Sequence, residues 1–229
     1  TEKKSIQLEL DVHIPKRPTP KKTLSKKTIN IGFLGTGKNE LYKDVIQDLS
    51  NNLSSYKLNI YAPKSLCQLL RKKTIPDSIT LIEFNFIKNY PDFIDAIKSF
   101  NLDFILQPAN LTDKNYQFKN LNALLLPYHC NCLTLFCDSP PYNSIKKLGL
   151  NELLTEKNAF SDKINQLITD NSKRIELTEI LFSFIEKNFS ANDNVKKLKE
   201  SLRFKNDKSD CLLQELKDLR FRKIEKIYN

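Results

Sequence analysis

The 229-residue chain contains no methionine and no tryptophan, and it has only four glycines, five cysteines and two histidines. With only His13 and His129 and no Gly-x-Ser-x-Gly elbow, a histidine-dependent nucleophilic triad has little support. No apolar run approaches the roughly 20 residues that span a bilayer. The odd, sparse cysteine set and the lack of an apolar segment after Thr1 favour a reducing, cytoplasmic location. Because translation begins with methionine, we expect Thr1 to follow a removed methionine or to begin a piece of a longer protein.

Cysteine and histidine gather at one place, where His129, Cys130 and Cys132 lie close together and Cys137 follows five residues later. Imidazole and thiolate are zinc ligands, so this cluster raises the question of a metal. The spacing does not match a zinc knuckle, and Cys132 and Cys137 fall on a predicted buried strand, where cysteine behaves as a small hydrophobe. We therefore expect no metal and no cofactor.

The chain carries 37 basic and 27 acidic residues, a net charge of +10, but the surplus lies at its two ends. Residues 1–27 hold eight basic and three acidic side chains, and residues 196–229 hold eleven and six, which leaves the stretch between them neutral. A nucleic-acid-binding domain normally concentrates basic charge on the folded domain, so a nucleic-acid partner is not expected. One interpretation is that the basic ends are solvated and serve solubility or tethering. The other is that they attach to an acidic partner or to the anionic inner face of a membrane.

Composition divides the chain into three parts. Residues 1–27 form a basic arm or linker rich in proline, with one alternating segment, Ser5–Ile14, that predicts a strand. Residues 28–190 carry alternating strand and helix patterns. Residues 191–229 have apolar positions three or four apart among many basic residues, which predicts an α-helical C-terminal extension with helices at Asn192–Phe204 and Ser209–Ile227.

The middle part has the pattern of an α/β domain. Short apolar runs predict strands, and stripes at helical spacing between and after them predict helices. Because parallel strands need helical crossovers, we expect a doubly wound parallel, Rossmann-like sheet flanked by helices. The predicted strands are Ile29–Leu34, Leu58–Tyr61, Ile79–Phe84, Phe104–Leu106 and Cys132–Phe136, and the predicted helices run from Leu41 to Leu53, Ser65 to Lys72, Tyr90 to Phe100, Phe118 to Leu125, Ala159 to Thr169 and Lys173 to Asn188.

A glycine-rich turn, Gly35-Thr36-Gly37-Lys38, follows the first predicted strand and precedes its helix. Ligands of open α/β sheets collect at the carboxyl ends of the strands, where glycines allow close approach and helix N-termini attract anions. The motif is neither a P-loop nor G-x-G-x-x-G. It indicates either a phosphate site or only a tight turn.

The order of motifs from Ile29 to about residue 190 resembles the C-terminal, nucleotide-sugar-binding domain of GT-B glycosyltransferases, including bacterial enzymes that build surface polysaccharides. The similar segments are Leu34–Gly37, Tyr90–Ile97 with Asn101–Pro108, Lys119-Asn120, Cys137–Tyr142, and Ile164–Asp170 with Arg174 and the helix after it. Each motif is short, so their order and spacing carry the resemblance.

The resemblance implies a metal-independent transferase whose donor is a nucleoside-diphosphate sugar, with basic side chains and loop amides stabilising the departing diphosphate. The positions implied for donor binding are Gly35, Thr36, Gly37, Lys38, Lys43, Lys119, Asn120 and Tyr142.

The chain also departs from the family pattern. Counted from Lys119, a basic residue of the family falls at Ala123 and its sugar-contacting glutamate at Leu126, while Asn131 replaces a small glycine and Thr36 stands where many relatives have arginine. Two hypotheses follow. The chain is either the donor domain of an active glycosyltransferase, with an acceptor domain before it or in a partner protein, or a catalytically degenerate domain that scaffolds protein interactions.

Overall fold

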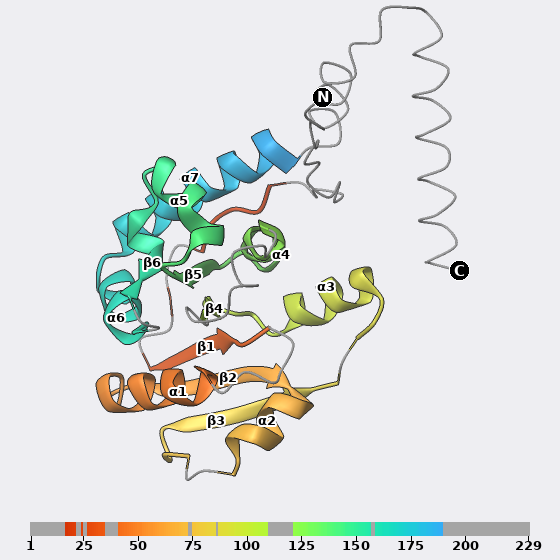
Figure 1. Ribbon diagram of the computed structural model, residues 1–229, viewed down its shortest axis with the longest axis vertical. Helices are drawn as coiled ribbons and strands as arrows, with labels where there is room; N and C mark the ends of the chain where they lie inside the picture. Colours follow the sequence, from red (N-terminus) through yellow and green to blue (C-terminus); the bar gives the residue numbers. More distant parts are fainter. Residues whose placement is uncertain are drawn as a thin grey trace, which may run out of the picture.

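The structure is a computed structural model, and it describes residues 17–21, 24, 27–34, 41–72, 75–85, 87–109, 121–156 and 159–189. Six parallel strands form one sheet in the order β3-β2-β1-β4-β5-β6 (Figure 1). This order confirms the predicted doubly wound α/β fold. The strands are β1 Thr28–Gly32, β2 Lys57–Pro63, β3 Ile79–Phe84, β4 Phe104–Gln107, β5 Leu133–Cys137 and β6 Leu154–Thr155. The α-helices are α1 Leu41–Asn52, α2 Lys64–Leu70, α3 Tyr90–Ser99, α4 Leu126–Cys130, α5 Asn143–Lys147, α6 Ser161–Thr169 and α7 Asn171–Phe189.

Apolar side chains build one cluster on each face of the sheet. In β4, Phe104 and Leu106 belong to the larger cluster and Ile105 to the smaller one. Because successive strand side chains point to opposite faces, the two clusters lie on opposite faces. The larger cluster includes buried residues of α1, α2, α6 and α7, whereas the smaller one includes Ile94 and Ile97 of α3 together with part of α4.

The helix α3 shows how local sequence sets an element. It begins just after Asn89, with Pro91 in its first turn, where the missing proline amide costs no helical hydrogen bond. Asp92 in the first turn and Lys98 in the last complement the helix dipole.

Most predicted elements are confirmed, with shifted ends. The strand predicted to end at Leu34 ends at Gly32, and β5 begins one residue later than predicted. The shift in β5 has a local cause: the amide of Cys132 donates to the carbonyl of Pro127 at 3.1 Å, so Cys132 still belongs to the turn that closes α4. The two-residue strand β6 and the short helix α5 were not predicted, because segments of two and five residues are too short to show a period.

The helix predicted from Phe118 to Leu125 is wrong in its described part. A 3-10 helix occupies Leu121–Leu124, and a separate α-helix, α4, begins at Leu126. Pro127 explains the break, since its ring would clash with the carbonyl four residues earlier, whereas proline fits the first turn of a new helix.

The predicted helices near the end of the domain are confirmed as α6 and α7. The helices predicted at Asn192–Phe204 and Ser209–Ile227, and the strand predicted at Ser5–Ile14, lie outside the described residues. The boundaries at 27/28 and 190/191 stay predictions. In the described part of the chain, no helix has both the length and the apolar character needed to cross a membrane.

Candidate functional site

The strand order places a switch point between β1 and β4. These two parallel strands are paired through Ile31 with Phe104 and Gly32 with Ile105, so their carboxyl ends meet at one edge of the sheet. After β1 the chain crosses towards β2, and after β4 it crosses the other way towards β5. In doubly wound sheets the crevice between such diverging connections is where ligands bind. The candidate site therefore lies at this edge.

Apolar side chains pack closely against Gly32, a residue that was not among the predicted site residues. A Cβ atom added at Gly32 would lie 2.7 Å from the Leu102 Cδ1 atom and 3.3 Å from the Leu34 Cγ atom. Leu102 is fully buried, so the neighbour has little room to move. The signal was present in the sequence, because a glycine inside an apolar strand often marks a close approach.

Six of the eight predicted donor-binding residues lie outside the described residues. They are Gly35, Thr36, Gly37 and Lys38 after β1, and Lys119 and Asn120 between β4 and the 3-10 helix. In the sequence, Gly35 comes three residues after the end of β1, and Lys119 comes between β4 and α4. Their roles stay predictions.

Lys43 is described, and it lies in the first turns of α1, on the side that faces α2 and the segment leading into β3. There it lines a shallow surface hollow of about 200 Å³ together with Gln47, Ser50 and Pro76. Because Pro76 precedes the start of β3, the hollow extends towards the amino edge of the sheet, away from the switch point. The role of Lys43 in phosphate binding stays a prediction.

Tyr142 lies in the turn that follows β5, at the same edge as the switch point. Its amide donates to the Ser139 carbonyl at 2.9 Å, and the neighbouring Asp138 carboxylate pairs with the Lys146 ammonium at 2.8 Å. The Tyr142 side chain is only 2% exposed, and its ring packs 4.5 Å from that of Phe136. Here the tyrosine packs in the core, and a contact with the donor stays a prediction.

The three described positions at which the chain departs from the glycosyltransferase pattern have apolar or backbone roles. Ala123 packs against the larger apolar cluster, and Leu126 packs against the smaller one. Asn131 closes α4 in the left-handed conformation, with φ 50° and ψ 50°. This backbone region favours glycine, and asparagine is the side chain that tolerates it best, so Asn131 fills a position suited to glycine.

The cysteines behave as core residues. Cys130, Cys132 and Cys137 are all buried, as the strand prediction for the last two implied. Burial, reinforced by the neighbouring Cys130 thiol, raises the pKa of Cys132 well above its ordinary value, so the protonated thiol is favoured. Among the residues that the structure describes, no three His, Cys, Asp or Glu side chains are grouped to hold a metal ion.

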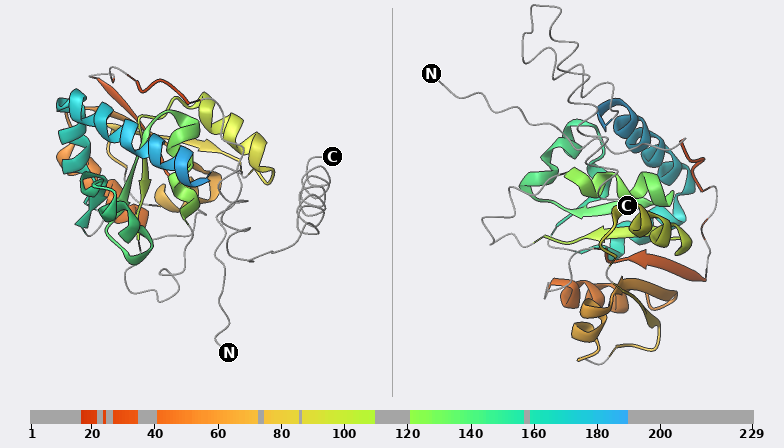
Figure 2. Two further views of the ribbon diagram at one scale, coloured as in Figure 1. Left: turned by 90° about the horizontal axis from the view of Figure 1, so that it is seen from above. Right: turned by 90° about the vertical axis from the view of Figure 1, so that its right-hand side faces the viewer.

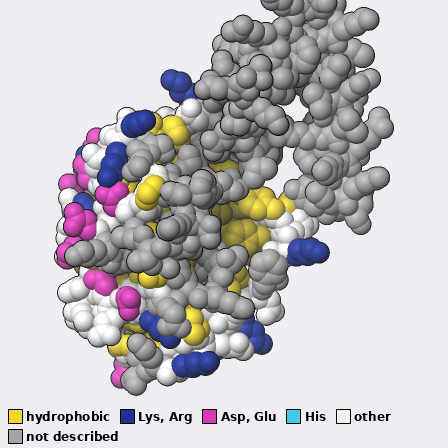
Figure 3. Space-filling view, in the orientation of Figure 1, with side chains coloured by type: hydrophobic (Ala, Val, Ile, Leu, Met, Phe, Trp, Pro, Cys, Tyr) yellow, Lys and Arg dark blue, Asp and Glu magenta, His cyan; other side chains and the backbone are white. Residues whose placement is uncertain are grey.

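Apolar and acidic side chains gather on different parts of the described surface. On the face drawn in Figure 3, hydrophobic side chains gather between α3 and α4, and acidic side chains gather on the opposite side, near α5 and α6. Tyr90, at the start of α3, is a large apolar residue that is 40% exposed. Its ring lies edge-on to that of His129 in α4.

Comparison with known proteins finds this fold in glycosyltransferases. A mutant of the O-GlcNAc transferase of Thermobaculum terrenum matches at 13% identity and a TM-score of 0.54, over 83% of this chain and 37% of that one. TarM matches at 16% identity and a TM-score of 0.57, over 84% and 38%. A TarM mutant from S. aureus, in complex with Fondaparinux, alpha-GlcNAc-glycerol and UDP, matches at 15% identity and a TM-score of 0.58, over 85% and 38%.

The chain thus spans less than two fifths of the length of each of these structures. No protein-family model matches it, and no curated protein matches it in sequence. At the level of the fold, the resemblance to a GT-B glycosyltransferase domain is confirmed.

Proposed function

We propose that this chain is the donor-binding domain of a glycosyltransferase and holds a nucleoside-diphosphate sugar at the switch point between β1 and β4. The observation that carries the proposal is the strand order, which creates a switch point at the carboxyl ends of β1 and β4. In the sequence, Gly35–Lys38 follow β1, and Lys119-Asn120 follow β4. The solved structure with UDP and the same fold supports a nucleotide as the ligand class.

The chemistry of these segments suits a diphosphate. Glycines let backbone amides approach phosphate oxygens, the N-terminus of α1 contributes its dipole, and lysines supply positive charge as the leaving group departs. These groups act without a metal ion. The acceptor would come from a further domain or a partner protein, because the matched transferases are more than twice as long as this chain.

A second candidate function is a protein-interaction module that keeps the fold without the reaction. The apolar packing of Ala123 and Leu126 favours it, because a cation and a carboxylate of the family's charged centre would fall at these positions. Losing a charged partner from such a centre weakens ligand binding strongly.

Thermal unfolding with UDP, GDP, CDP and their sugars separates the two candidates. A ligand at about 100 times its dissociation constant stabilises the folded state by about 2.7 kcal/mol, which raises the midpoint of a domain of this size by about 5–10 °C. An active donor site predicts such a shift with at least one nucleotide, and no shift with any of them would favour the interaction module.

A lysine pair tests the site itself. Lys119→Ala should abolish the ligand-induced shift, because it removes the predicted phosphate contact. Lys98→Ala is the control, because it also removes one positive charge. Lys98 lies in the last turn of α3 and pairs with Asp95, so this variant should leave the ligand-induced shift unchanged. An undiminished shift in Lys119→Ala would exclude this residue from the site.

A further inference from the structure

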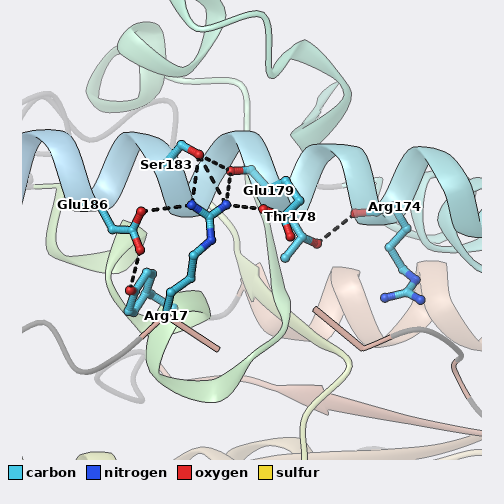
Figure 4. A network of polar contacts seen from close by, with 7 residues as sticks. Arg17, Arg174, Thr178, Glu179, Ser183 and Glu186 are labelled. Atoms are coloured by element: carbon cyan, nitrogen blue, oxygen red, sulfur yellow. Dashed lines mark hydrogen bonds and ion pairs between the residues drawn. The ribbon is translucent and has the colours of Figure 1, made fainter. Parts of the chain in front are cut away.

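Described residues of the N-terminal arm contact the domain, and Arg17 contacts α7. The Arg17 guanidinium pairs with the carboxylates of Glu179 and Glu186, the latter at 3.0 Å, and both of its terminal nitrogens lie 3.3 Å from the Ser183 hydroxyl (Figure 4). These three partners are spaced four and three residues apart on α7, so they form one stripe of that helix. Figures 1 and 2 show the arm passing beside α7.

The contact continues from α7 into α4. While one oxygen of Glu186 accepts from Arg17, the other accepts from the Tyr128 hydroxyl at 2.9 Å. Tyr128 belongs to α4, is only 2% exposed, and packs its ring against Phe182 of α7 at 5.0 Å. Arg17 is therefore joined to the middle of α4 through a single carboxylate.

The arm also holds the end of α4 and the turn before β4. The carbonyl of Thr19 accepts a hydrogen bond from the Asn131 side-chain amide, at the residue that closes α4, at 2.8 Å. Lys21 donates to the Leu102 carbonyl at 2.6 Å and pairs with Asp103 at 3.4 Å. The carbonyl of Lys21 accepts from Arg174 of α7 at 2.7 Å. The docked arm thus ties together α7, α4 and the entrance to β4.

The helix α4 depends on such contacts. It has only five residues, a length of about 7 Å, and helices this short are not stable alone. At its start, the amides of Tyr128 and His129 both donate a hydrogen bond to the Leu125 carbonyl, at 3.1 and 3.3 Å. Tertiary contacts must therefore set where α4 lies.

We propose that Arg17 is a positioning residue for the donor site: through Glu186 and Tyr128 it sets the position of α4, which follows the segment carrying Lys119 and Asn120. This role rests on the proposed function. A helix of five residues moves as one body. Contacts at Tyr128 and Asn131 therefore also fix the position of its first residue, Leu126, and of the 3-10 helix before it.

The test uses the full chain and three variants. Arg17→Ala removes the contact, and Arg17→Lys keeps the charge but loses the planar fork that reaches two carboxylates at once. Arg71→Ala is the control, because Arg71 also makes a surface ion pair, with Glu83 of β3 at 2.7 Å, and β3 lies at the edge of the sheet away from β4 and β5. The measurements are hydrogen exchange of the Tyr128 and His129 amides and the affinities for UDP, GDP and CDP.

Arg17→Ala should accelerate exchange in α4 and weaken nucleotide binding by about tenfold, a common size for coupling between distant sites. Arg17→Lys should give a smaller change in both, and Arg71→Ala should change neither. Unchanged exchange in Arg17→Ala, or faster exchange with unchanged affinity, would overturn the proposal. If the wild-type chain binds none of the three diphosphates, the proposed function fails and this role with it, while exchange still reports whether the arm orders α4.

Discussion

At the scale of single residues, the fold changes the acid–base chemistry of Tyr128. Burial, the hydrogen bond to Glu186 and the charge of that carboxylate together raise the pKa of Tyr128 to about 12 from its ordinary value of 10. All three causes favour the neutral phenol. The folded chain therefore holds this proton at a pH at which the unfolded chain releases it.

This difference predicts a pH dependence of stability. The contribution of Tyr128 is complete below pH 10 and is lost as the pH rises from 10 to 12, because only the unfolded chain loses the proton in that range. Tyr128→Phe cannot show this loss. Denaturant unfolding should find the wild type more stable than Tyr128→Phe at pH 9, with the gap narrowing by about 1–2 kcal/mol by pH 12. A stability difference between wild type and Tyr128→Phe that stays constant from pH 9 to pH 12 would contradict the raised pKa of Tyr128.

At the scale of elements, one carboxylate joins the beginning and the end of the domain. Asp48 lies in α1, and its oxygens accept from the amides of Phe160 and Ser161 at 2.8 and 2.9 Å and from the Ser161 hydroxyl at 2.7 Å. These groups lie at the N-terminus of α6, where the capping residue Phe160 makes no side-chain hydrogen bond of its own. Asp48 therefore caps a helix that lies more than 110 residues away in the sequence.

Removing this cap should weaken the whole domain. Phe160 and Ser161 are buried, so Asp48→Ala leaves buried amides without an acceptor, at a cost of about 2 kcal/mol. Thermal unfolding should show a midpoint lower by about 4–8 °C. Asp44→Ala, an exposed position in the first turn of the same helix, is the control and should cost less than half as much. Equal losses in the two variants would refute the capping role.

The same contacts show which elements a sequence can reveal. The strand Ile79–Phe84 and the helix α7 were predictable, because each has enough residues for an apolar period to appear. The strand at Phe104–Leu106 was predictable as a continuous apolar run. The docking of Arg17 was not predictable. A lysine- and proline-rich segment is typical of solvated chain, and the partners Glu179 and Glu186 lie 162 and 169 residues further on. At the site, the edge of the sheet was predictable from topology, whereas the burial of Tyr142 depends on packing that no local pattern encodes.

At the scale of the whole molecule, the net charge separates the two ends of the sequence from its middle. The stretch between residues 28 and 195 is neutral, and the net +10 comes from the two ends. Basic residues near an anionic membrane contribute about 1 kcal/mol each, and screening limits their reach to about 10 Å at 0.1 M salt. We therefore expect the basic residues at the ends, and not the neutral middle, to bind an anionic membrane.

This difference predicts how the chain meets anionic vesicles. The full chain should sediment with phosphatidylserine vesicles at low salt and dissociate as salt rises, because screening weakens each contact. Neutralising five basic residues of the C-terminal segment should reduce binding by about a hundredfold or more, whereas neutralising five lysines of the described surface should leave it nearly unchanged. The first set is Lys217, Arg220, Arg222, Lys223 and Lys226, and the second is Lys57, Lys72, Lys98, Lys147 and Lys163, all changed to glutamine. Equal losses from the two sets would show that the folded middle makes the contact, and equal binding to uncharged vesicles would exclude electrostatic attachment.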